Sequence, residues 1–173
     1  MFMLRTVLVV GALFAADNAL AQSTLPPADA IPLPAQMPVY DTALAPGWEN
    51  WSWAKVEMGI EVNGSTRKPI RVEAGPHQAL YLHHAPFSTQ GMTKLSLLIQ
   101  GSAPDGEVRV FALIDGKVAN EGRAVKIGNT GWTKVVTPLA TLGVEDKIID
   151  GIWVQNAKDA DLPKFYVTEI KID

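Results

Sequence analysis

The sequence contains no cysteine. This absence excludes disulfide bonds, zinc–thiolate sites, iron–sulfur clusters, thiol catalysis and a lipid-modified amino-terminal cysteine. A surplus of positive charge is also missing, because 15 Lys and Arg residues stand against 18 Asp and Glu residues, for a net charge of −3. The chain therefore lacks the electrostatic footprint of a nucleic-acid-binding protein. The 173 residues, of which 47% are hydrophobic, are enough to form one domain with its own core. Without disulfide bonds, that domain must be stabilised by packing.

A long apolar run is missing as well. The most apolar stretch, residues 6–16, falls short of the roughly twenty residues that a membrane-spanning helix needs. It follows Arg5 and precedes Ala19-Leu20-Ala21, which has small residues where a signal peptidase cuts. We interpret residues 1–21 as a secretory signal peptide, the alternative being an uncleaved anchor. The mature chain is then expected to be secreted or periplasmic, without membrane insertion.

Residues 22–38 contain five prolines. Proline at this density forbids a helix and favours an extended tether. We interpret this segment as a proline-rich linker. The folded domain is expected to cover residues 39–173.

From residue 39 onward, apolar residues recur with period two and are interrupted by turn sequences such as Asn63-Gly64 and Asp115-Gly116. This pattern is typical of a sandwich or barrel. The sequence therefore predicts an all-β fold, either a sandwich or a barrel. The predicted strands cover residues 39–44, 50–58, 68–74, 78–84, 93–101, 107–114, 123–127, 132–137, 148–155 and 164–172. The only helix-like piece, residues 138–143, is expected to form a single turn.

Five of these strands, residues 50–58, 78–84, 93–101, 107–114 and 148–155, separate into an aliphatic face and a second face. Alternate residues point to opposite sides of a strand. If the five strands share one sheet, its outer face carries aromatic and planar polar side chains together. The candidate ligand-binding residues on this face are Trp51, Trp53, Tyr81, His83, Arg109, Trp153 and Gln155.

Such a face suits a sugar ligand. Aromatic rings bury a large area at little rotamer cost, so they form a preformed platform for the apolar faces of pyranose rings. Arg and Gln side chains supply the planar hydrogen-bonding groups that hydroxyls require. A glycan platform should leave Trp51, Trp53 and Tyr81 exposed and coplanar. The alternative is that some of these aromatics are core residues covered by a loop, and Trp48 could either line the platform or plug the end of the sandwich.

Several short segments are familiar in combination. They are Leu44-Ala45-Pro46-Gly47-Trp48, Asn50-Trp51-Ser52-Trp53, Leu80-Tyr81-Leu82-His83-His84, Gly131-Trp132-Thr133, Gly151-Ile152-Trp153-Val154-Gln155 and Phe165-Tyr166-Val167. The chain resembles the galactose-binding-like jelly rolls that serve as carbohydrate-binding modules in secreted bacterial and fungal proteins. The resemblance spans residues 39–173 and implies an antiparallel β-sandwich of the jelly-roll type. It also implies a polysaccharide or other glycan as the partner.

The sequence departs from that family in one respect. Many relatives end in Phe-Tyr-Val/Ile-Asp-Asp-Ile, whose acidic residues help to hold a structural calcium ion, whereas this chain has Val167-Thr168-Glu169-Ile170. Calcium needs six to eight oxygen ligands, of which Asp41, Glu57 and Glu169 could supply some. We predict no cofactor and keep a structural calcium ion as the alternative.

The sequence contains few residues that could form a catalytic site. A retaining glycosidase needs two carboxylates about 5 Å apart, and Glu57 and Glu61 have a suitable spacing but lie beside Gly59 and a turn. His83 and His84 are adjacent strand residues, so they should point to opposite faces and not chelate one ion. No Gly-x-Ser-x-Gly, phosphate-loop, dinucleotide or His-Glu-x-x-His motif occurs.

The sequence therefore predicts a non-enzymatic glycan-binding protein. Two alternatives stay open. The first is an envelope structural or protein-docking β-sandwich, whose outer face should be more continuous and aliphatic. The second is a small jelly-roll glycoside hydrolase or polysaccharide lyase, which would require a deep cleft with two facing carboxylates or a His/Tyr pair.

Overall fold

The computed structural model describes residues 35–173. The predicted signal peptide and most of the predicted linker lie outside the described residues. Within these residues every regular element is a β-strand. They contain no helix that is long and apolar enough to cross a membrane. The strands are β1 (Met37–Tyr40), β2 (Trp48–Asn50), β3 (Lys55–Glu57), β4 (Ile70–Ala74), β5 (Ala79–Ser88), β6 (Lys94–Gly101), β7 (Gly106–Ile114), β8 (Lys117–Val118), β9 (Arg123–Ile127), β10 (Thr133–Pro138), β11 (Ile148–Gln155) and β12 (Leu162–Ile172).

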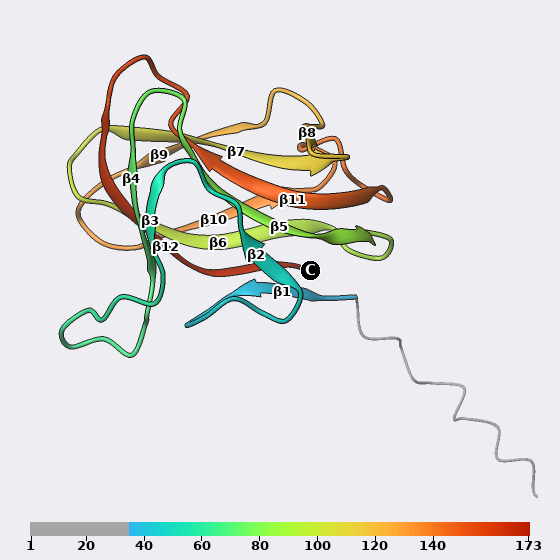
Figure 1. The fold of residues 1–173 in the computed structure, drawn as a ribbon, viewed down its shortest axis with the longest axis horizontal. Helices are drawn as coiled ribbons and strands as arrows, with labels where there is room; N and C mark the ends of the chain where they lie inside the picture. The colour runs from blue at the N-terminus through green and yellow to red at the C-terminus, as the bar shows by residue number, and fades with distance from the viewer. Residues whose placement is uncertain (1–34) are drawn as a thin grey trace, which may run out of the picture. The chain divides into compact units, whose positions relative to one another are not determined.

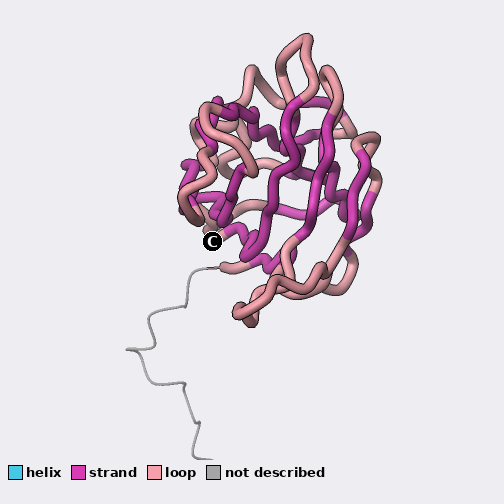
Figure 2. The backbone as a smooth tube through the Cα atoms, turned by 90° about the vertical axis from the view of Figure 1, so that its left-hand side faces the viewer, coloured by secondary structure: helices cyan, strands magenta, loops and turns pink. Residues whose placement is uncertain are grey.

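The strands form two antiparallel sheets, which Figures 1 and 2 show as two layers. The first sheet has the order β10-β6-β12-β4-β3, with β1 also paired to β12. The second has the order β2-β5-β11-β7-β8, with β9 also paired to β7. From β4 to β7 and from β9 to β12, each strand lies in the opposite sheet from its predecessor, as in jelly rolls. The predicted fold class, an all-β jelly-roll sandwich, is confirmed.

The core lies between the two sheets and is built by the predicted alternation. Alternate aliphatic residues of β5, β7 and β11 and of the facing strands β4, β6 and β12 belong to the buried core. Strands β5, β7 and β11 also bury residues on their other side, such as Tyr81 and Phe111. The buried aliphatic residues include Leu80, Leu82, Val108, Val110, Ile152 and Val154 from one sheet and Ile70, Val72, Leu95, Leu97, Ile99 and Val167 from the other. The inward faces predicted for residues 78–84, 93–101, 107–114 and 148–155 are therefore confirmed.

The condition that the five strands share one sheet is not met. Strand β6 belongs to the opposite sheet, because an aliphatic inner face suits either side of a sandwich equally well. The predicted strand over residues 50–58 is also broken. Asn50 Oδ1 accepts hydrogen bonds from the Ser52 N–H (3.1 Å) and hydroxyl (2.6 Å), which bends the chain, so that β2 joins one sheet and β3 the other.

Other differences lie at strand ends. Strand β1 begins at Met37, two residues before the expected start of the domain, and pairs Met37 with Ile172 and Pro38 with Lys171. The short β8, which pairs with the end of β7, had no counterpart among the predicted strands. Residues 138–143 form hydrogen-bonded turns, with the Thr141 N–H donating to the Pro138 carbonyl at 3.0 Å.

The core assignment generates a first prediction. Leu97 is buried between the sheets, so Leu97→Ala should lower the free energy of unfolding by about 2–5 kcal/mol. Val136→Ala on β10 is the control, because Val136 is exposed and its truncation should cost less than about 0.5 kcal/mol. Urea unfolding measures both values. Equal, small losses would show that the two faces are assigned backwards.

Candidate ligand-binding face

The segment that crosses from β2 to β3, residues 51–54, runs along the edge of the second sheet beside β5. The Trp51 N–H donates to the Tyr81 carbonyl at 2.9 Å, and the Ala54 N–H donates to the Ala79 carbonyl at 3.2 Å. Between them, Ser52 Oγ accepts from the Tyr81 N–H at 2.9 Å. These bonds leave the two flanking indoles on the outside, where Trp51 is 52% exposed and Trp53 is 42% exposed.

Both indole rings are held in place. Trp51 Nε1 donates to Glu49 Oε2 at 2.7 Å, and its ring stacks on His83 with a centroid distance of 3.6 Å and an interplanar angle of 9°. Trp53 Nε1 donates to the His77 carbonyl at 3.0 Å. Because His83 covers one face of Trp51, only the other face of that ring is free for a ligand.

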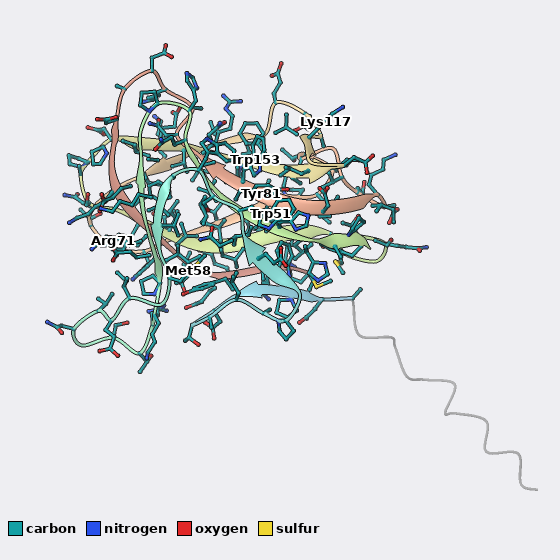
Figure 3. All side chains as sticks on the ribbon, viewed as in Figure 1. Trp51, Met58, Arg71, Tyr81, Lys117 and Trp153 are labelled. Carbon is teal, nitrogen blue, oxygen red and sulfur yellow. The ribbon has the colours of Figure 1, made fainter. Side chains whose placement is uncertain are left out.

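An aromatic row continues from these indoles across the sheet. Trp153 on β11 lies opposite Tyr81 on β5 and opposite Phe111 on β7, with ring centroids 5.7 Å and 6.1 Å away. The edge of Trp53 meets Trp153 at 4.8 Å, and Trp51 lies 5.9 Å from Tyr81. Figure 3 shows Trp51, Tyr81 and Trp153 following one another over the middle of the sheet.

Two expectations about these rings are wrong. Tyr81 is only 8% exposed, because Trp51, Trp53 and Trp153 surround it. The Trp51–Tyr81 and Trp53–Tyr81 pairs are steeply inclined, at 80° and 75°, and not coplanar. Burial raises the pKa of the Tyr81 hydroxyl, and the charge of Asp150 adds to the rise. Tyr81 is thus a protonated support beneath the two exposed indoles.

Polar residues adjoin this aromatic row. Arg109 and Gln155 are register partners on β7 and β11. The Arg109 guanidinium donates to the Glu121 carbonyl at 2.7 Å, and Gln155 Nε2 donates to the His77 carbonyl at 2.8 Å. The seven candidate residues therefore lie on the outer side of one sheet and of its edge segment. Their role in binding stays a prediction.

The structure also shows a contributor that sequence reasoning missed. The His77 carbonyl accepts from both Trp53 and Gln155, and His77 has a φ of 58°, in the left-handed region. The Gly75-Pro76 dipeptide is of a kind typical of turns. It carried no signal that a backbone oxygen of this turn would bind two site side chains.

Other candidates lie apart from this face. His84 points away from His83 and packs on Trp48 and Phe87, with centroid distances of 5.1 Å and 5.2 Å. Trp48 is buried in the core cluster, so of the two roles considered for it, filling the sandwich is the one observed. Glu57 pairs with Arg71 and Glu61 with Lys68.

Two of the three carboxylates considered for calcium have other partners. Glu169 Oε1 lies 2.7 Å from Arg67 Nε, and Glu57 pairs with Arg71. Among residues 35–173, no three His, Asp or Glu side chains gather in a group that could hold a metal ion. The calcium alternative stays without a test.

Neither the known family models nor the curated proteins include a match to this sequence. Solved structures do match. An arginine-to-alanine variant of a family 29 carbohydrate-binding module superposes with a TM-score of 0.55 at 13% identity, over 80% of this chain and 91% of that one. A lysine-to-alanine variant complexed with cellulohexaose gives 0.56 at 14%, over 80% and 89%. A family 29 module from Piromyces equi gives 0.54 at 19%, over 80% and 89%.

These comparisons define the class of the fold. The described domain is a β-sandwich with the architecture of carbohydrate-binding modules, and family 29 modules are among its structural neighbours. The resemblance that the sequence indicated is confirmed at the level of the fold.

The packing of Tyr81 generates a second prediction. Gly151 lies under the Tyr81 ring, and a Cβ atom there would stand 2.6 Å from Tyr81 Cε2 and 2.9 Å from the Leu82 carbonyl oxygen. Gly151→Ala should therefore displace the ring and cost about 1–3 kcal/mol of stability. Gly128→Ala is the control, because a Cβ there meets nothing within 4 Å. Thermal unfolding and near-ultraviolet circular dichroism would contradict this packing if both variants behaved alike.

Proposed function

We propose that the protein is a non-catalytic carbohydrate-binding protein that recognises a polysaccharide or other glycan on the face carrying Trp51 and Trp53. The observation that carries this proposal is the pair of half-exposed indoles whose N–H groups are already bound by the protein itself. Their polar atoms are satisfied, so the exposed ring surface is the part left to interact. Aromatic surfaces of this kind suit the apolar faces of sugar rings.

The fixed positions of these side chains also support the proposed function. His83 holds Trp51 by stacking, and the His77 carbonyl holds Trp53 and Gln155. Side chains fixed before binding lose little conformational entropy when the ligand arrives. An open face with two such rings should bind with modest affinity, in the manner of an exposed platform.

The structural neighbours support the ligand class. One neighbour is described in complex with cellulohexaose, which makes this oligosaccharide the first probe for the present chain. The proposal includes no catalytic role, since Glu57 and Glu61 are each occupied in ion pairs away from the aromatic row. It also includes an extracytoplasmic location, secreted or periplasmic, on the strength of residues 1–21.

One observation favours a second candidate. The rings of Trp51, Tyr81, Trp53 and Trp153 contact one another edge to face without polar gaps, and continuous aromatic surfaces are also used to dock proteins. A protein-docking role would show itself as a chain that binds no glycan at all.

A glycan array with and without calcium, followed by calorimetry with the best oligosaccharide, tests the proposal. Trp51→Ala and Trp53→Ala should each weaken binding by about 1–3 kcal/mol, as aromatic anchors do. Each should lower stability by less than about 1 kcal/mol, because the rings lie half outside the fold.

Val136→Ala, on the opposite sheet, is the matched control and should bind like the unmodified protein. Loss of several kcal/mol of stability in either tryptophan variant, with glycan affinity unchanged, would make these rings structural. Absence of binding to every glycan on the array would refute the proposed function and favour the docking role.

A further inference from the structure

The tip of the connection between β3 and β4, residues 61–68, is exposed throughout and projects beyond the sheets (Figure 1). At this tip the Ser65 N–H donates to the Val62 carbonyl at 3.0 Å, so Asn63 and Gly64 are the central residues of a β-turn. Gly64 has a φ of 75°, in the range that the second central residue of a type II turn requires. The turn that the Asn63-Gly64 sequence predicted is therefore present.

The base of this connection is held together by one side chain. The Tyr40 hydroxyl accepts a hydrogen bond from the Gly59 N–H at 2.9 Å and donates one to the Lys68 carbonyl at 2.7 Å. The Ile60 N–H also donates to the Pro69 carbonyl at 3.1 Å. Because both ends of the connection are fixed, its tip can react chemically while the rest of the fold stays intact.

Two groups that can react with each other at the tip are both free. Neither the Asn63 side chain nor the Gly64 N–H takes part in a hydrogen bond within residues 35–173. A Cβ atom built on Gly64 would meet nothing within 4 Å, and glycine has no side chain that shields its own nitrogen. The Gly64 nitrogen can therefore turn toward the side-chain amide carbon of Asn63.

We propose that Asn63 is a site of spontaneous deamidation. In this reaction the Gly64 nitrogen gives up its proton and forms a bond with Asn63 Cγ, while the C–N bond of the side-chain amide breaks and ammonia leaves with that proton. The product is a five-membered succinimide ring. Water then adds to either ring carbonyl and breaks the bond between that carbonyl carbon and the nitrogen, which leaves aspartate or isoaspartate. Water is consumed and ammonia is released, with no oxidation or reduction.

A second turn of similar sequence shows why the free nitrogen matters. Asp115-Gly116 joins β7 to β8, with φ values of 51° and 69°, and it is also exposed. There, however, the Gly116 N–H donates to Asp150 Oδ2 at 2.6 Å. This bond fixes the peptide plane, so the Gly116 nitrogen cannot turn toward the side chain of residue 115. The sequence presents the two turns alike, and the structure separates them.

The experiment follows the mass of the protein during storage in a mildly alkaline buffer, with peptide mapping to locate each change. The peptide that contains Asn63 should gain about one dalton, and its aspartate and isoaspartate products should separate on chromatography. Peptides with the other asparagines, none of which precedes glycine, should keep their mass. Asn63→Gln should also keep its mass at this position, because a glutamine side chain would have to close a larger and slower-forming ring.

Asp115→Asn is the matched control, because it gives the same dipeptide sequence to the turn whose glycine nitrogen is bonded. Position 115 of this variant should deamidate several times more slowly than position 63, and thermal unfolding verifies that each variant is folded. Equal rates at the two positions would overturn the role assigned to the free Gly64 nitrogen. An unchanged mass at Asn63, under conditions in which a short peptide of the same sequence deamidates fully, would overturn the proposal altogether.

Discussion

The candidate site depends on the hydrogen bonds that tie residues 51–54 to strand β5. Asn50 bends the chain out of β2, and Ser52 and the Trp51 backbone then bond to both the N–H and the carbonyl of Tyr81. This pairing anchors a non-strand segment along the edge of one sheet and lets the chain cross to the other sheet. Trp51 and Trp53, which are separated by Ser52, are thereby placed on the outside, over Tyr81.

Strands β5, β11 and β7 of the second sheet support the two exposed indoles from below. Tyr81, Trp153 and Phe111 are register neighbours on three adjacent strands, so the pairing of β5, β11 and β7 alone brings their rings into contact. Gly151 provides the space into which Tyr81 leans. The aromatic row is thus a consequence of strand register, and the exposed indoles rest on it.

The sequence was sufficient for some parts of this description and insufficient for others. Period-two alternation identified the inward residues of β5, β7 and β11 and placed Arg109, Trp153 and Gln155 together on the outer side, because alternation is a local property. It could not assign β6 to a sheet, since both sheets present the same aliphatic face to the core. It also could not foresee the burial of Tyr81, which depends on rings from two other segments, residues 51–54 and β11. Nor could it foresee the role of the His77 carbonyl, because a backbone oxygen is the same at every position.

The most direct test of the account follows the tryptophan indole N–H signals by nuclear magnetic resonance during titration with a bound glycan. The signals of Trp51 and Trp53 should shift. Those of the core residue Trp48 and of Trp132, which precedes β10 in the opposite sheet, should stay in place. A glycan that binds while shifting only Trp132, or neither Trp51 nor Trp53, would show that the aromatic face is not the binding site.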